Sequence, residues 1–440
     1  MHAVAISPYA SCALARWGLA AALVVAPSVG HAQLRLTDAQ TAARRASPEL
    51  RAAREAVAAA AARERQAGAF LNPTLTYGRE QTSRSGQISA QDIAQLEQSL
   101  EIGGQRGVRR DAARLRHSAA DARLAAATAQ LDFEVARAFV QAIAADGRAR
   151  LAEQTIGAFS DAQRVSERRL AAGDVSGYVV RRLRLEMARY AAVRAAAMLD
   201  RRARRVELAS LLARPPSDAE SLALPTELPL TADSSAVSRA LGAPDSLLAL
   251  AQRNRADVRA AALDAAAGLA EARLVSRERV PTPTLSAGYK GETLRDSLGA
   301  GARFGGFVAG LSLPLPLFDR RGGATEAAAA DSRRLDAETE VARRRVAREI
   351  TDAIDALQAA ETQRAVLAPH LGEAARVALR AVQASYVEGE ITLAEWLDAV
   401  RAYQEAESTY LTLQADVAIG RAALERAVGA PLTMTTRSDQ

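Results

Sequence analysis

The sequence predicts a mainly α protein with a transmembrane β part, built by internal duplication. Aromatic residues make up only 4% of its 440 residues, so most helix contacts must come from small side chains on closely packed helices. Two pairs of segments alternate between apolar and polar or small residues, as strands do. Several short motifs recur in the same order in both halves of the chain, which indicates two copies of one unit.

The first residues are typical of an export signal. Arg16 precedes the apolar run 17–29, and Gly30 and Ala32 supply the small residues expected before cleavage after Ala32. A membrane anchor is the alternative, but the run is short for crossing a bilayer. The only cysteine, Cys12, lies in this segment. The exported chain would therefore carry neither a disulfide nor an N-terminal cysteine for a lipid.

The charge of the chain is weak evidence for a nucleic-acid partner. The net charge is +6 and the isoelectric point is about 9.9, with a local cluster of arginines at 201–205. Acidic residues are interspersed with the arginines through most of the chain, which is typical of solvated helix faces. Together with export, this pattern predicts no nucleic-acid partner.

The rest of the chain divides into two similar units. "LNPTLTYG" (71–78) matches "PTPTLSAGY" (281–289), and "RRLAAGDVSG" (168–177) matches "ASYVEGEITL" (384–393). We expect a signal peptide at 1–32, a first structural repeat at 33–214 and a second at 246–431. The proline-bearing segment 215–245 would be a linker or equatorial segment, and 432–440 a C-terminal tail.

Two strands are expected in each repeat, at about 70–83 and 91–103 and at about 282–292 and 303–317. Leu75 and Tyr77 share one face of the first strand, while Thr74 and Thr76 share the other. A sheet packed on a soluble core gives the same alternation, but each strand is long enough to cross an outer membrane at a tilt. Four strands cannot close a barrel. Strands in lipid would therefore require oligomerisation, and three copies with about twelve strands are the most economical closure.

Long helices fill the remainder of each unit. Helices are expected at 36–69 and 246–280, followed after the strands by very long ones at 104–172 and 322–388. At 1.5 Å per residue each long helix would extend on the order of 100 Å, and two shorter helices end to end could pair with it as an antiparallel coiled coil. Pro369 lies inside the second long helix, where a kink or break is expected.

The strand-to-helix junctions are marked by glycine and proline. Glycines would allow the sharp change of direction, while prolines would keep the chain extended and outside a regular ladder. The junction residues expected are Gly103, Gly104, Arg106, Pro314, Pro316, Gly322 and Gly323.

With these elements in place, the chain resembles the TolC-like outer-membrane efflux proteins over essentially all of its exported part. "LEIGGQR" (100–106) and "LPLPLFDRRGG" (313–323) are most similar to the branch that exports heavy-metal cations of the cobalt–zinc–cadmium type. The resemblance implies a homotrimer in which a twelve-stranded β-barrel continues into a twelve-helix periplasmic tunnel. It also implies docking to a periplasmic adaptor (membrane-fusion) protein and to an inner-membrane pump of the resistance-nodulation-division type.

The resemblance also places functional residues at the tunnel tip. Tyr386 and Gly389 match the family's Tyr-x-x-Gly turn, and Glu395 and Asp398 occupy its two acidic positions. Six carboxylates in a trimer would form an aperture that attracts cations, whereas the plainer interpretation is two solvated helix charges. The first repeat keeps Gly173, and both glycines also suit helix C-caps. The first repeat has Leu170 in place of the tyrosine and Val179 in place of the first acidic residue. The sequence therefore does not decide whether the tip of the first repeat takes part in gating.

No catalytic, cofactor or metal site is indicated. The exported part contains only His117 and His370, no cysteine, and three methionines without metal-site spacing. No enzyme is therefore predicted, and the resemblance implies a passive exit channel, with heavy-metal cations as the expected substrate. Drug or small-molecule efflux and protein secretion are alternative channel functions. A periplasmic coiled-coil scaffold or adaptor is an alternative of another class.

Overall fold

A computed structural model of the protein describes residues 33–228, 244–296, 298 and 300–432. The expected signal peptide, residues 229–243 of the linker and most of the C-terminal tail lie outside the described residues. None of the described helices has an apolar stretch long enough to cross a bilayer.

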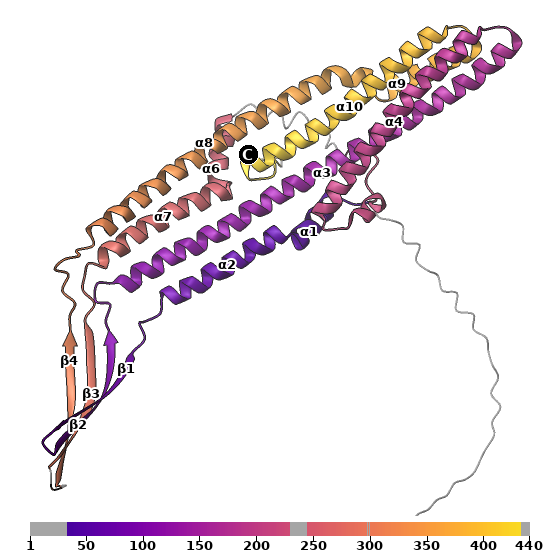
Figure 1. Ribbon diagram of the computed structural model, residues 1–440. Coiled ribbons are helices and arrows are strands. Elements are labelled where there is room, and N and C mark those ends of the chain that lie inside the picture. Colours follow the sequence, from indigo (N-terminus) through magenta and orange to yellow (C-terminus); the bar gives the residue numbers. More distant parts are fainter. Residues whose placement is uncertain (1–32, 229–243, 297, 299, 433–440) are drawn as a thin grey trace, which may run out of the picture.

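The described chain forms an elongated slab with a small sheet at one end (Figure 1). Its strands are β1 (Thr74–Arg84), β2 (Gln87–Ser99), β3 (Thr284–Arg295) and β4 (Gly301–Ser312). They pair antiparallel in the order β1-β2-β3-β4, so β1 and β4 are the two edges of this sheet.

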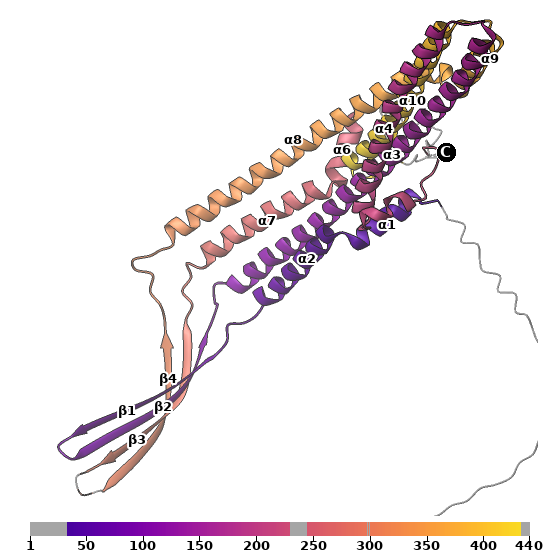
Figure 2. The ribbon, with the colours of Figure 1, turned by 45° about the vertical axis from the view of Figure 1, so that its right-hand side comes forward.

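The helices continue this order away from the sheet. Near the strands, the order across the slab is α2 (Pro48–Ala67), α3 (Gln105–Ala172), α7 (Ala256–Arg277) and α8 (Gly322–Leu367). Towards the far tip, α4 (Gly177–Leu211) packs on α3, which packs on α10 (Leu393–Val428). Helices α8 and α9 (Glu373–Glu388) complete that side (Figure 2). The slab is therefore about four elements wide from strands to tip.

Each long helix pairs with two shorter ones, as the lengths predict. Helix α3 packs on α2 in the half nearer the sheet and on α4 in the half nearer the tip, while α8 packs on α7 and α10. Pro369 interrupts the second long helix: α8 ends at Leu367, and a 3₁₀ turn, η2 (Ala368–His370), precedes α9. Proline removes a backbone donor and clashes with the preceding turn, which explains the break.

The expected unbroken helices before the strands were wrong. The first is split into α1 (Leu36–Ala46) and α2, because Ser47 precedes Pro48 and is pushed into an extended conformation with ψ near 122°. The second is split into α6 (Pro244–Asn254) and α7 at Arg255, which is also extended. The buried guanidinium of Arg255 binds the carboxylates of Asp257 and Glu349. These bonds stabilise Arg255 in the extended conformation between the two helices.

Two apolar cores lie near the middle of the slab, where these short helices end. One joins α1, α3, α4 and the 3₁₀ turn η1 (Pro216–Ser221) around the fully buried Phe139 and Leu208. The other joins α6, α7, α8 and α10 around Val346, Leu357 and Leu424. The duplication seen in the sequence is thus repeated in the packing, with one core for each copy.

The four strands differ from their expected limits at both ends. Strands β1 and β2 meet at a two-residue turn, Ser85 and Gly86, whose φ angles are 50° and 85°. Two positive φ values fit the twist of a tight hairpin. The longer loop implied by the expected strand limits, 70–83 and 91–103, was therefore wrong. Strand β4 ends at Ser312 because Pro314 and Pro316 have no N–H to continue a ladder.

Strand register places apolar residues side by side on one face of the sheet. In two successive rows across all four strands, the residues are Leu75, Leu96, Ala287 and Ala309, then Tyr77, Ala94, Tyr289 and Phe307. Phe307 is 94% exposed although it contacts the edge of the Tyr289 ring. An apolar face this exposed within one chain needs a cover from outside the chain.

The two junctions turn by different means. Gly104 takes the left-handed conformation, with φ of 73°, immediately before α3. In the second repeat Arg321 takes that conformation, with φ of 53°, while Gly322 and Gly323 already belong to the first turn of α8. The expectation that these two glycines make the turn was therefore wrong. The N–H of Arg321 donates to the carboxylate of Asp319 at 2.7 Å, which holds the non-glycine residue in this conformation.

Candidate functional site: the helical tip

The tip of the slab consists of two helical turns closed by glycine. Gly173 follows α3 with φ of 84°, and Gly389 follows α9 with φ of 89°. At each turn the next residue's N–H bonds back to a carbonyl five residues earlier, from Asp174 to Arg169 and from Glu390 to Ser385. This double-bonded glycine cap reverses the chain sharply because glycine adopts the left-handed conformation at no steric cost.

An aromatic cluster lies beneath these turns. The Phe159 ring lies 4.7 Å from the Tyr190 ring and meets the edge of the Trp396 ring at 5.0 Å. Tyr386 stacks on Trp396 with ring centroids 5.4 Å apart. These four side chains come from α3, α4, α9 and α10 and are nearly or fully buried. The cluster therefore joins the tip hairpins of both repeats within one chain.

Tyr386 is tied to the first repeat by polar contacts as well. Its hydroxyl lies 2.7 Å from Ser166 Oγ, and the Ser166 hydroxyl itself donates to the Ala162 carbonyl. The Arg169 guanidinium lies over the Tyr386 ring and donates to the Val387 carbonyl at 3.2 Å. The first-repeat tip lacks its own tyrosine, but it supplies the residues that hold the tyrosine of the second repeat.

A second cross-link lies one layer deeper. Arg401 of α10 donates to the carboxylate of Glu186 of α4 at 2.5 Å, and Glu186 is only 9% exposed. A buried carboxylate needs such a partner because leaving water is costly for an unpaired charge. The two hairpins are therefore joined at two levels, by Tyr386 with Ser166 nearer the tip and by Arg401 with Glu186 further from it.

Glu395 has a local structural role that the sequence reasoning missed. Its carboxylate accepts from the Thr392 N–H at 2.7 Å and from the Thr392 hydroxyl, while the Glu395 N–H donates to Thr392 Oγ1. This reciprocal capping box begins α10. The bonds from the Thr392 backbone and hydroxyl lower the pKa of Glu395 below its ordinary value, so the carboxylate stays charged at neutral pH.

Asp398 lies one turn further along the same helix. Glu395 and Asp398 are both exposed, whereas Trp396 and Leu397 between them are buried. The two carboxylates therefore share the exposed side of α10 near the tip. Their role in an aperture between copies stays a prediction.

Sequence reasoning missed most of the residues that build the tip. Trp396 is one of only two tryptophans in the chain, and the other lies in the N-terminal segment. Its position beside the Tyr386 turn was a usable signal in a chain with so few aromatics. No comparable signal marked Ser166 or Glu186, because each acquires its role from a partner more than 200 residues away.

The described residues contain no group of three or more side chains placed to hold a metal ion. His117 contacts the carboxylate of Glu64, with 2.8 Å between Nδ1 and Oε2. The contacts at the tip hold the helical hairpins of the two repeats against each other.

Comparison with known proteins agrees with this geometry. Residues 247–430 match the family model "Outer membrane efflux protein". The chain is 27% identical over 363 residues to the cobalt-zinc-cadmium resistance protein CzcC of Cupriavidus metallidurans, covering 81% of this chain and 82% of CzcC. It is 28% identical over 301 residues to the nickel-cobalt-cadmium resistance protein NccC of Alcaligenes xylosoxydans xylosoxydans, covering 64% of this chain and 61% of NccC.

The fold is similar to that of solved channel proteins. The crystal structure of CusC, described in connection with transmembrane channel formation, superposes with a TM-score of 0.71 at 17% identity. The match covers 91% of this chain and 93% of CusC. The slab of strands and long helices is thus the fold of a TolC-like channel subunit. Residues 247–430 match the outer membrane efflux protein family, and over 81% of its length the chain is similar to the cobalt-zinc-cadmium resistance protein CzcC.

Proposed function

We propose that three copies of this chain form the outer-membrane exit channel of a tripartite efflux system for heavy-metal cations. The observation that carries the proposal is the four-wide slab, whose order is the same in the sheet and in the helices. One edge of the slab consists of β1, α2 and α4, and the other of β4, α8 and α9. If the β1 edge of each copy packs against the β4 edge of the next, the copies close into a ring when the rotation between neighbouring copies is a whole fraction of a turn. A closed ring of strands has no strand edge facing lipid.

Exposed apolar side chains on both edges support this closure. Helix α4 presents Tyr178, Leu185 and Leu199, which are spaced at multiples of seven and are 61–72% exposed. On the other edge α8 and α9 expose valines at 341, 366, 377 and 387. Seven-residue spacing is the pattern of a helix seam, so each α4 is suited to pack against the α8–α9 edge of the next copy.

The apolar face of the sheet supports placement in the outer membrane. Its exposed Leu, Tyr and Phe side chains would face lipid, while the polar face would line a water-filled passage. The helices would then extend through the periplasm towards an adaptor protein and an inner-membrane pump. Export by cleavage after Ala32 belongs to the same proposal.

The proposed cation preference rests on Glu395 and Asp398 and on the similarity to CzcC and NccC, which are metal resistance proteins. Three copies would bring six carboxylates to the tip, where charged rings favour cations. The channel would conduct passively and catalyse no reaction, leaving the choice of metal to the pump.

The test is single-channel recording of the purified protein in planar bilayers, with the cation-over-anion permeability ratio measured. Glu395→Gln with Asp398→Asn removes the charges, and glutamine can still form the capping box. The matched control, Glu405→Gln with Asp416→Asn, neutralises two exposed carboxylates of α10 away from the tip.

Loss of cation preference in the tip variant alone is the expected result. In the parent, that preference should persist at about pH 5 and weaken only as the pH falls through the lowered pKa of Glu395. Equal selectivity in the parent and both variants would discard the carboxylate ring. A water-soluble monomer without channel activity would overturn the channel itself.

A further inference from the structure

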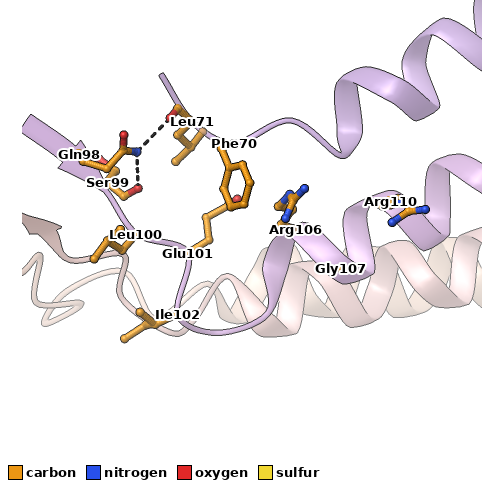
Figure 3. A pocket seen from close by; sticks show the side chains of 10 residues that line it. All are labelled: Phe70, Leu71, Gln98, Ser99, Leu100, Glu101, Ile102, Arg106, Gly107 and Arg110. Atoms are coloured by element: carbon orange, nitrogen blue, oxygen red, sulfur yellow. Dashed lines mark hydrogen bonds between the residues drawn. The ribbon is translucent and has the colours of Figure 1, made fainter. Parts of the chain in front are cut away.

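An open hollow lies where β1 and β2 join the helices of the first repeat (Figure 3). Its volume is about 590 Å³. One wall is the segment before β1, with Phe70 and Leu71, and the other is the segment after β2, with Leu100 and Ile102. Arg106 and Arg110, in the first turns of α3, line its end nearest the helices.

The two arginines leave positive charge at this end of the hollow. Arg106 donates through Nε to the Gly68 carbonyl at 2.6 Å, and its guanidinium lies 3.7 Å from the centre of the Phe70 ring. These contacts fix its position without neutralising it. Arg110 is exposed and has no ion-pair or hydrogen-bond partner within the described ranges.

The one carboxylate in the hollow is already committed. Glu101 accepts two bonds from Arg109, at 2.6 and 3.0 Å, and Arg109 also donates to the Ala67 carbonyl. Two parallel bonds between a guanidinium and a carboxylate form the strongest common pairing of these groups. Glu101 therefore leaves Arg106 and Arg110 available to an anion from outside the chain.

The remaining walls are apolar and continue the exposed face of the sheet. Leu71, Leu100 and Ile102 are 41–64% exposed and lie just beyond the ends of β1 and β2, whose exposed apolar residues include Leu75 and Leu96. The amide of Gln98 donates to the carbonyls of Leu71 and Ser99, which ties the two walls together. A molecule seated here would meet cations at its helical end and hydrocarbon side chains at its strand end.

We propose that this hollow binds the phosphate headgroup of a membrane phospholipid, with an acyl chain along the apolar walls. The proposal rests on the proposed placement of the sheet in the outer membrane, which puts the hollow at the boundary between lipid and periplasm. Guanidinium groups bind phosphate with several charge-assisted bonds, and basic pockets at membrane boundaries bind anionic headgroups. A free phosphate would use the arginines but would leave the apolar walls uncovered.

The other occupant to consider is the apolar segment Leu313–Phe318 of a neighbouring copy. That segment follows the β4 edge, which would lie beside β1 in a closed ring. It carries no acidic group before Asp319, so it would cover the walls and leave both guanidinium charges unanswered. Charge complementarity therefore favours the lipid.

Native mass spectrometry of the detergent-solubilised trimer, titrated with phosphatidylglycerol, tests the proposal. Arg110→Gln is the first variant, because Arg110 makes no hydrogen bond or ion pair with the described residues and its replacement should not disturb folding. The double variant Arg106→Gln with Arg110→Gln removes both charges and is the stronger test. Arg51→Gln with Arg137→Gln is the matched control, removing two exposed arginines elsewhere. A galactosyl diacylglycerol without phosphate and inorganic phosphate alone serve as further probes.

We expect one more phosphatidylglycerol per chain on the parent and the control than on the double variant, with at least about tenfold weaker binding in that variant. Equal lipid binding by all three proteins would overturn the proposal. So would equal retention of the galactolipid, or full displacement of the lipid by inorganic phosphate.

Cysteine cross-linking separates the two occupants. In a Cys12→Ser background, Leu71→Cys with Leu315→Cys should give no efficient disulfide between copies while lipid is bound. Rapid cross-linking of lipid-loaded trimers would assign the hollow to the neighbouring chain and overturn the proposal. Single-channel conductance of the same preparations keeps the two proposals apart: conducting trimers without a variant-sensitive lipid would refute the lipid site alone.

Discussion

The bond between Tyr386 and Ser166 offers the sharpest test of how the tip is held. Tyr386→Phe removes the hydroxyl and leaves the ring stacked on Trp396. The Ser166 hydroxyl keeps its bond to the Ala162 carbonyl at 2.8 Å, so no buried donor is left unsatisfied. The expected loss is therefore that of one ordinary hydrogen bond, about 1 kcal/mol per chain.

That loss corresponds to about a fivefold shift towards separation of the two hairpins in each chain. If the three tips of a trimer open together, the shift is about a hundredfold, since distant equivalent sites add. Amide hydrogen exchange across 385–400 measures the first quantity, and open probability in planar bilayers measures the second. Tyr410→Phe is the control, because no hydrogen bond of the Tyr410 hydroxyl is found in the described part of the chain.

Ser166→Ala should cost more than Tyr386→Phe, because it leaves the tyrosine hydroxyl buried without a partner. The double variant Tyr386→Phe with Ser166→Ala should then resemble Tyr386→Phe alone. Strictly additive effects, or a Tyr386→Phe variant that exchanges like the Tyr410→Phe control, would refute the reasoning that this bond fastens the tip.

Three further outcomes are expected from the packing. Gly323→Ala should leave the stability of the protein unchanged or slightly higher, because Gly323 lies in the first turn of α8 with open space around it. Gly389→Ala should destabilise the tip, because residue 389 has a φ of 89° and the added Cβ would collide with the Arg169 guanidinium. Equal melting temperatures of the two variants would contradict this. Asp146→Asn should lower the free energy of unfolding by about 3–5 kcal/mol, because Arg205 and Asp146 form a buried ion pair with contacts at 2.8 and 2.5 Å. A decrease of less than about 1 kcal/mol in thermal unfolding would show that this ion pair is dispensable. Phe307→Lys should cost about 2–4 kcal/mol and reduce trimer yield in membranes; normal folding would argue against a lipid-facing sheet.

Local patterns were enough to predict the classes of element in this protein. The alternation around Leu75, Phe307 and Leu311 has a period of two, which only a strand can place on one face. The long stretches before Gly173 and Gly389 lack strong breakers, and Pro369 marks the interruption of one of them. These signals lie within a few residues of one another, so the sequence alone carries them.

Breaks and turns were harder because they depend on contacts outside the local pattern. The break at Arg255 is stabilised by Glu349 of another helix, and the turn at Arg321 needs a neighbouring carboxylate rather than glycine. Composition favours glycine at such turns, and it pointed to Gly322 and Gly323 instead. A local rule fails where a side chain from elsewhere supplies the stabilising bond.

The sequence by itself determined the duplication and the strand and helix periodicity, because each is a property of neighbouring residues or of recurring motifs. Only the tertiary structure decided which hairpins meet at the tip, with Tyr386 beside Ser166 and Glu186 beside Arg401. It also decided that Arg106 and Arg110 flank an apolar hollow. These arrangements join residues from separate elements, and only the folding of the slab brings such residues within bonding distance.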